Sequence, residues 1–263
     1  MRPILIVLLL VVGANLFAQE RPAFGVYGDF SDNIHSADFQ HLPGVPSCCP
    51  RYETGTGPGI AAGVLYSLPV ATDLMMQFRL GFQSIGATLS ETEFTTVYHN
   101  SAPVQGAFTH TLDASISTLG LEPIVGWKVL GKLQLHLGMH AALLLAKSYT
   151  QQEQITQPDG SGTFLDSLGN DSHSRIRNQS SGTIPNASAF QAALITGISY
   201  SLPLNEQRTM ELHPELMYSY GVTNIATSLQ WKANSVRAGV VLLFSPLHTP
   251  EHVPVPPKEE REK

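Results

Sequence analysis

A period of two residues in hydrophobicity constrains the fold of this chain more than any other feature. In residues 133–146, LQLHLGMHAALLLA, every odd position is apolar, whereas the even positions begin with glutamine, histidine, glycine and histidine. Successive side chains of a β-strand point to opposite faces, so the segment predicts a strand with one apolar face and one polar or small face. A helix would fit only the second half of the segment.

The same alternation recurs along the chain and predicts an all-β fold of eight strands. The predicted strands cover residues 24–30, 60–68, 74–83, 117–129, 133–146, 190–202, 210–220 and 234–244. Short turns connect some of them, at 68–73, 130–132 and 203–208, whereas the long polar connections are 31–57, 87–110, 148–188 and 222–233. Short turns at one end and long loops at the other are typical of an antiparallel up-and-down transmembrane β-barrel.

The composition of the two strand faces favours a membrane barrel over a soluble one. The polar face is mostly glycine, alanine, serine and glutamine, which suits the narrow, side-chain-filled lumen of an eight-stranded barrel. The apolar face carries aromatic residues near the strand ends, as interfacial girdles do. These are Tyr66, Trp127, Tyr200, Tyr218, Tyr220 and Phe244. A secreted soluble β-barrel that binds an apolar ligand is the alternative.

The first residues, MRPILIVLLLVVGANLFAQE, have the layout of a secretory signal peptide. Arg2 precedes an apolar run, and the small residue Ala18 precedes Gln19, which predicts that residues 1–18 are removed by cleavage near Ala18. The apolar run is about half as long as the roughly 20 residues of a spanning helix. The 263-residue chain has 14% charged residues and a net charge of −6, so it offers no signature of nucleic-acid binding.

Residues 22–244 resemble the small eight-stranded outer-membrane barrels, the group that includes the OmpA transmembrane domain and OmpX. The most specific part is the last predicted strand, SVRAGVVLLF, which ends at Phe244 and resembles the terminal signal read by the barrel-assembly machinery. The resemblance implies a barrel domain over residues 19–244, a bacterial outer-membrane location and outer-membrane lipid as a partner.

The resemblance departs from OmpA-like proteins after the last strand. Residues 245–263, SPLHTPEHVPVPPKEEREK, are rich in proline and then in charge, which predicts a disordered periplasmic tail. A peptidoglycan-binding domain would follow here in OmpA-like proteins. No such domain is expected in this chain, so that function is not carried over.

Four charged residues fall on the polar faces of the predicted strands: Arg79, Glu122, Glu215 and Arg237. Charges in a narrow lumen need partners, because an isolated buried charge costs several kcal/mol. The strand order predicts that Arg79 pairs with Glu122, and that Glu215 pairs with Arg237. This network would be a structural plug that closes the lumen or, alternatively, the lining of a gated pore.

Histidines also lie on the predicted inner face. His136, His140 and His213 are expected to be polar filler of the lumen, and no metal or cofactor is expected. The sequence HLGMH has the outer histidines of a zinc-protease motif, but that motif needs a helix and a glutamate after the first histidine.

Catalytic residues could stand only at the rim on the loop side. The candidates there are His99, His110, Asp113 and His173. No spacing among them pairs a nucleophile with a base, so the chain is not expected to be an enzyme.

Cys48 and Cys49 are the only cysteines of the chain and lie between Pro46 and Pro50. The predicted topology puts residues 31–57 in the first extracellular loop, where an oxidising environment favours disulfides. Two thiols are too few to close a tetrahedral zinc site, and thioredoxin-like spacing is absent. We therefore expect a vicinal disulfide that stiffens the loop.

The expected function is a structural or surface-interaction role carried by extracellular loops on a barrel with a closed lumen. Loops 31–57 and 148–188 are the expected contact surfaces for a partner. A small-solute channel is the main alternative.

Overall fold

The structure is a computed structural model that describes residues 22–46, 50–99, 102–158 and 162–246. Its regular elements are β-strands. They are β1 (Ala23–Phe39), β2 (Tyr52–Ala71), β3 (Leu74–Ser84), β4 (Ala87–His99), β5 (Ala102–Leu130), β6 (Leu133–Gln157), β7 (Ile176–Thr183), β8 (Phe190–Tyr200), β9 (Leu202–Pro203), β10 (Met210–Gly221) and β11 (Gln230–Phe244).

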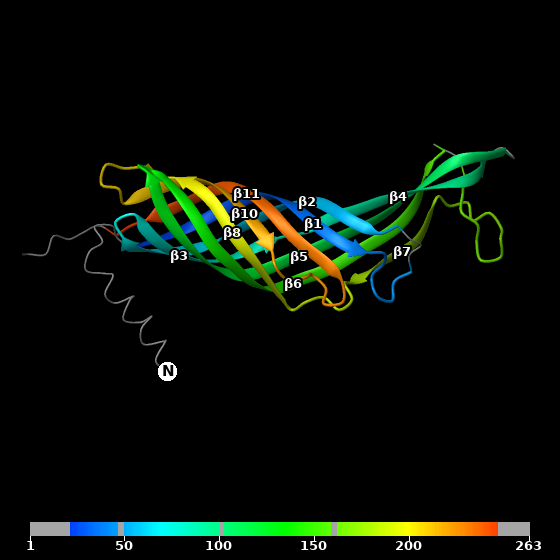
Figure 1. Cartoon of the computed structure of the whole chain (residues 1–263), viewed down its shortest axis with the longest axis horizontal. Helices are drawn as coiled ribbons and strands as arrows, with labels where there is room; N and C mark the ends of the chain where they lie inside the picture. The colour runs from blue at the N-terminus through cyan, green and yellow to red at the C-terminus, as the bar shows by residue number, and fades with distance from the viewer. Residues whose placement is uncertain (1–21, 47–49, 100–101, 159–161, 247–263) are drawn as a thin grey trace, which may run out of the picture.

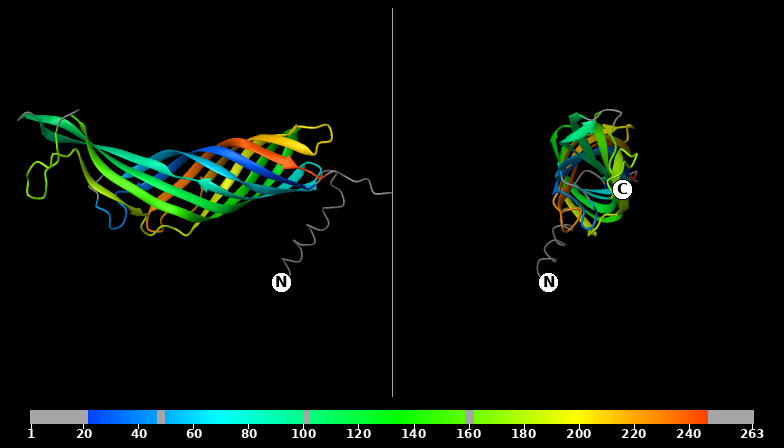
Figure 2. Two further views of the ribbon diagram at one scale, coloured as in Figure 1. Left: turned by 180° about the vertical axis from the view of Figure 1, so that it is seen from behind. Right: turned by 90° about the vertical axis from the view of Figure 1, so that its right-hand side faces the viewer.

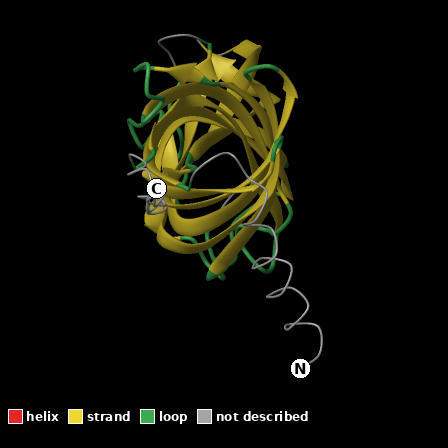
Figure 3. Cartoon of the chain, turned by 90° about the vertical axis from the view of Figure 1, so that its left-hand side faces the viewer, coloured by secondary structure: helices red, strands yellow, loops and turns green. Residues whose placement is uncertain are grey.

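Eight of these strands pair into a closed ring, and Figures 1 and 3 show it from the side and along its axis. Going round it, the order is β1, β2, β3, β5, β6, β8, β10 and β11, and every neighbouring pair is antiparallel. The ring closes where β11 pairs with β1 from Phe24–Phe244 to Asp38–Gln230. The predicted eight-stranded antiparallel up-and-down barrel is therefore confirmed.

One wall of the barrel is much taller than the rest. β4 continues the line of β3 after a break at residues 85–86, and β7 precedes β8 along the same side of β6. β5 and β6, of 29 and 25 residues, run through both levels. We call β4, β7 and residues 102–114 and 148–157 the projecting sheet, which extends beyond the ring (Figures 1 and 2).

The prediction of long irregular loops was wrong in three places. Residues 87–110 form β4 and part of β5, residues 148–188 contain the end of β6 and all of β7, and β1 and β2 occupy much of 31–57. The period of two persists there, but its outer positions are mostly hydroxyl, amide and acidic side chains. Because the outward residues are no longer apolar there, the sequence pattern predicts strands that end too early.

The two levels of the barrel have opposite polarity. In the ring, Phe24 and Phe30 are 65% and 79% exposed on the outside, whereas Asp29 is buried inside. In the projecting sheet, Thr88 is outside and exposed, whereas Leu89 is inside and fully buried. Side chains alternate between the faces within each level, and a register shift in β6 at Leu145 lies near the boundary. The change in polarity reflects which residue types occupy each face.

An apolar core fills the barrel where the ring meets the projecting sheet. Its largest side chain is Trp231, whose Nε1 donates to Nδ1 of His35 over 3.0 Å. His35 therefore carries its proton on Nε2, which donates to the carbonyl of Ile85 over 2.8 Å at the break between β3 and β4. The other main members of the core are Phe39, Leu42, Tyr52, Leu89, Leu112, Ile116, Tyr149, Ile184 and Ile225.

Several predictions fall outside the described residues. They are the signal peptide of residues 1–18, the disulfide between Cys48 and Cys49, and nearly all of the tail of residues 245–263. No helix in the described ranges is both long and apolar enough to span a membrane.

Glycines narrow the lumen near its turn end. Tyr27 lies with its hydroxyl against Gly81 and its ring against Gly63, and these glycines face each other in β3 and β2. The guanidinium of Arg79 sits 5.2 Å from the centre of the Tyr27 ring, within cation–π range. A side chain at Gly81 would overlap the Tyr27 hydroxyl.

We predict that Gly81→Val destabilises the barrel, because overpacking of a filled interior costs about 1–3 kcal/mol. Gly28→Val is the matched control, because a Cβ at Gly28 meets nothing within 4 Å. Urea unfolding of both variants in detergent micelles, followed by tryptophan fluorescence, measures the difference. Equal free energies of unfolding would contradict the packing described here.

Candidate functional site

The four charged residues expected in the lumen form one buried layer. Arg79 and Arg237 are fully buried, and Glu122 and Glu215 are nearly so. They come from β3, β11, β5 and β10 respectively. In the ring order, β3 stands opposite β10 and β5 stands opposite β11. The four residues therefore lie at the ends of two diameters of the barrel that cross each other.

The ion pairs span these diameters. Arg79 donates from Nη1 and Nη2 to the two carboxylate oxygens of Glu215, over 2.6 and 2.8 Å. Arg237 donates in the same forked manner to Glu122, over 2.9 and 3.3 Å. Such bidentate pairs are the strongest ion-pair geometry available to arginine.

The predicted pairing of neighbours was therefore wrong, although Arg79 and Glu122 do face each other in β3 and β5. Side chains of neighbouring strands stand side by side and point together towards the barrel axis. A long arginine reaches a carboxylate head-on only across the lumen. Arg79 is also steadied from its own strand, because Gln77 Oε1 accepts from Nε and Nη2 over 3.3 and 3.0 Å.

The three lumen histidines are all buried and extend the layer in both directions. His140 Nδ1 donates to Glu122 Oε1 over 3.0 Å, which gives that carboxylate a third hydrogen bond. His136 Nε2 lies 2.7 Å from the hydroxyl of Ser199, and His213 donates to Glu211 over 3.0 Å. They do not converge on one point, and no group of three His, Cys, Asp or Glu in the described ranges is placed to hold a metal ion.

Asp29 is a buried charged residue of the ring that the sequence analysis missed. It lies on the inner face of β1, 4% exposed, and neither carboxylate oxygen has a hydrogen-bond partner among the described residues. It interacts electrostatically with both arginines and both glutamates of the layer. The signal was present in the sequence, because Asp29 has the inward parity of its strand.

Polar side chains continue across the lumen above the charged layer. Gln83 donates to the hydroxyl of Ser235 over 3.3 Å, and the void beside this pair measures only about 20 Å³. The apolar core around Trp231 follows directly. Two layers of different chemistry therefore lie across the axis.

The rim residues considered for catalysis do not assemble. His110 and Asp113 are on opposite faces of β5, where His110 is buried and Asp113 accepts from Thr88 over 2.5 Å at the surface. His173 is exposed in the segment between β6 and β7, and His99 ends β4.

Inside the projecting sheet, Glu153 is the polar centre. Its carboxylate accepts from Arg177 Nε over 2.7 Å and from Asn178 Nδ2 over 2.8 Å. His110 Nδ1 lies 3.5 Å from the same carboxylate. Arg177 also lies over the ring of Phe164, 4.2 Å from its centre, which anchors the segment between β6 and β7 to the sheet.

That segment is ordered by its own carboxylates. Asp166 accepts from the backbone N–H groups of Asn170 and Leu168, each over 2.9 Å. Because these bonds favour the charged form, they lower the pKa of Asp166.

No protein-family model and no curated protein matches this chain. Among solved structures, Neisserial surface protein A superposes with a TM-score of 0.36 and 16% identity, over 86% of this chain and 99% of that one. Ail, the attachment invasion locus protein of Yersinia pestis, superposes with a TM-score of 0.36 and 9% identity, over 86% of this chain and 100% of that one. Ail in complex with the heparin analogue sucrose octasulfate gives 0.34 and 10% over the same shares. These scores are too low to support an argument, so the barrel assignment rests on the strand pairing.

We predict that Arg79 couples energetically to Glu215 more than to Glu122. A double-mutant cycle with Arg79→Met and Glu215→Gln should give a coupling of roughly 2–4 kcal/mol, because each single change leaves a buried charge without its partner. The cycle of Arg79→Met with Glu122→Gln is the matched control and should give a smaller value. A larger coupling to Glu122 would mean that neighbours pair along the wall.

Proposed function

We propose that this chain is a non-enzymatic outer-membrane β-barrel with a closed lumen, and that its function is surface interaction through the projecting sheet. The ring would be embedded in lipid, with its short turns in the periplasm. The projecting sheet would stand outside the cell.

The observation that carries this proposal is the reversal of polarity along the strands. An apolar outside around a polar inside suits lipid, whereas a polar outside around an apolar core suits water. The apolar band on β8 runs from Phe190 to Tyr200, 11 residues. Ten steps of about 3.3 Å at a tilt of about 45° give roughly 23 Å, close to the height of the apolar band of outer-membrane barrels.

The ends of the band carry aromatic side chains on the outside. Phe24, Tyr66, Trp127, Tyr200 and Phe244 lie near the turn end of the ring, and Phe82, Phe190 and Tyr220 lie near the other end. Aromatic girdles of this kind mark the two membrane interfaces. Phe244 ends β11, the strand that closes the ring, which suits recognition of that strand by the barrel-assembly machinery.

The projecting sheet supports a surface role by its shape and chemistry. Its outer face carries rows of hydroxyl groups, in which Thr109 lies 3.3 Å from Thr92 and 3.2 Å from Thr156. Beyond Leu89, β4 pairs only with β5 in the described structure, so its other edge presents unpaired backbone groups. Such an edge can accept a strand from another molecule.

The interior gives less support to the alternatives. In a small-solute channel, the side chains of both the charged layer and the apolar core would have to move aside to open a path along the axis. A soluble carrier of apolar ligands would need a cavity of a few hundred Å³ with apolar walls. The void beside Gln83 and Ser235 measures about 20 Å³, and the larger cavity at the turn end is lined by charged side chains.

We predict that the projecting sheet is accessible from outside the cell and that the turns are not. In a Cys48→Ser/Cys49→Ser background, Thr92→Cys should react with a membrane-impermeant maleimide on intact cells. Lys132→Cys, in the turn between β5 and β6, should react only after the outer membrane is permeabilised. Labelling of both on intact cells, or recovery of the protein in the soluble periplasmic fraction, would contradict the topology.

We predict that the protein gives little or no steady conductance in planar lipid bilayers, because two layers block the lumen. The double variant Arg79→Met/Glu215→Gln should stay closed, since the apolar core around Trp231 is untouched by it. A large steady conductance of the unmodified protein would favour the channel alternative.

A further inference from the structure

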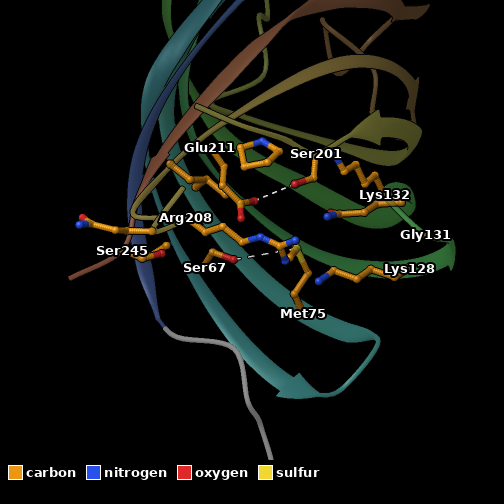
Figure 4. A pocket seen from close by; sticks show the side chains of 14 residues that line it. Ser67, Met75, Lys128, Gly131, Lys132, Ser201, Arg208, Glu211 and Ser245 are labelled. Carbon is orange, nitrogen blue, oxygen red and sulfur yellow. Dashed lines mark hydrogen bonds between the residues drawn. The ribbon is translucent and has the colours of Figure 1, made fainter. Parts of the chain in front are cut away.

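A second site lies at the opposite end of the barrel from the projecting sheet. It is a cavity of about 530 Å³ at the mouth formed by the short turns (Figure 4). Its walls come from β2 and β3, from the turn between β5 and β6, and from the turn that precedes β10. Neither the sequence analysis nor the proposed surface function assigns a role to it.

The cavity is lined by an excess of positive charge. Lys128, Lys132 and Arg208 line it, against the single carboxylate of Glu211. Glu211 already accepts from Ser201 over 2.8 Å and from His213 over 3.0 Å, and it interacts electrostatically with Lys128. Neither Lys132 nor Arg208 forms an ion pair with any described residue.

A buried amide points to a missing ligand. Gln134 lines the cavity and is fully buried, yet neither its Oε1 nor its Nε2 has a hydrogen-bond partner among the described residues. It stands opposite Lys128 in the pairing of β6 with β5. Unpaired buried polar groups are rare in folded proteins and are normally satisfied by water, an ion or a ligand.

The turns hold the cations in place. The backbone N–H of Lys128 donates to the carbonyl of Asp73 over 2.8 Å, and the carbonyl of Lys132 accepts from the N–H of Ser201 over 2.9 Å. Arg208 has a φ of 51°, a left-handed conformation that glycine or asparagine adopts with less steric strain. An arginine kept at such a position fits a role for its side chain.

We propose that this cavity binds a small soluble phosphate or phosphate monoester from the periplasmic side. A compact dianion would neutralise the excess of two positive charges, and its oxygens would accept from cations that come from separate turns. The guanidinium of Arg208 can bind two phosphate oxygens at once, and the lysines act as point charges. The Gln134 amide would donate the remaining hydrogen bond.

The cations line the inside of the mouth rather than the outer surface of the ring. Lys128 has the same parity on β5 as the buried Glu122, and its neighbour Trp127 is 56% exposed on the outside. A lipid headgroup would have to leave the outer surface to reach the cavity, which favours a soluble ligand over a lipid.

Calorimetric titration of the full chain in uncharged detergent micelles at low salt tests the proposal, with inorganic phosphate and glycerol 3-phosphate as probes. We expect saturable binding at one site. Arg208→Asn should weaken it about tenfold or more, because a charge-assisted hydrogen bond is lost. Asparagine tolerates the left-handed backbone, so this variant should fold at least as well as the unmodified protein.

Gln134→Leu should also weaken binding while raising the temperature of unfolding, because it removes the unpaired amide. Lys147→Gln, which removes one positive charge far from the turns, should leave binding unchanged. Absence of saturable binding, or equal weakening by Lys147→Gln, would overturn the proposal. Tighter binding of succinate than of phosphate would overturn the choice of phosphate.

The same titration in phosphatidylcholine vesicles with and without phosphatidylglycerol separates the two sources of phosphate. We expect phosphatidylglycerol to have no effect. Its competition with inorganic phosphate would assign the cavity to a lipid headgroup and overturn the soluble ligand. None of these measurements depends on the projecting sheet, so they succeed or fail independently of the surface function.

Discussion

Two crossed ion pairs fix the centre of this barrel, and much of the remaining structure depends on them. Arg79 with Glu215, and Arg237 with Glu122, each join strands that stand on opposite sides of the ring. Because the two ion pairs cross, they constrain the width of the barrel in two directions, whereas one pair would constrain it in only one. They also fix register, since a slip of one residue would turn each charge from the lumen to the apolar outer face. Glycines around Tyr27 and the small side chains of the inner face keep the lumen narrow enough for these contacts.

The same strands serve two environments. In the ring, the interior is polar and paired, and the exterior is apolar. Beyond the break between β3 and β4, the interior becomes the apolar core around Trp231 and the exterior becomes rows of threonine and serine. The strands continue across this boundary, with a register shift in β6 at Leu145, and apolar and polar residues exchange faces there. The apolar core stabilises the base of the projecting sheet by hydrophobic burial, as the core of a water-soluble protein does. The projecting sheet is therefore stabilised by this packing as well as by its strand pairing with the ring.

This arrangement separates three tasks along one axis. The projecting sheet presents a polar face and an open strand edge at one end. The charged layer and the apolar core lie in the middle, and the cationic cavity opens at the other end. The two buried layers separate the two ends of the barrel. A ligand at the turn end and a partner at the projecting sheet can each be studied without the other.

The sequence by itself determined the strands of the ring, their antiparallel order and the inward position of Arg79, Glu122, Glu215 and Arg237. These follow from a period of two and from loop lengths, which are local properties. It also contained the parity of Asp29, although that residue was overlooked.

The projecting sheet was missed because its outward residues are polar, so the apolar pattern used to find strands vanished while the strand continued. Only the tertiary structure decided which charges pair, because partners across a lumen are neighbours neither in sequence nor in the sheet. The gathering of Lys132, Arg208 and Gln134 around one cavity was decided in the same way, since turns distant along the chain meet only when the ring closes.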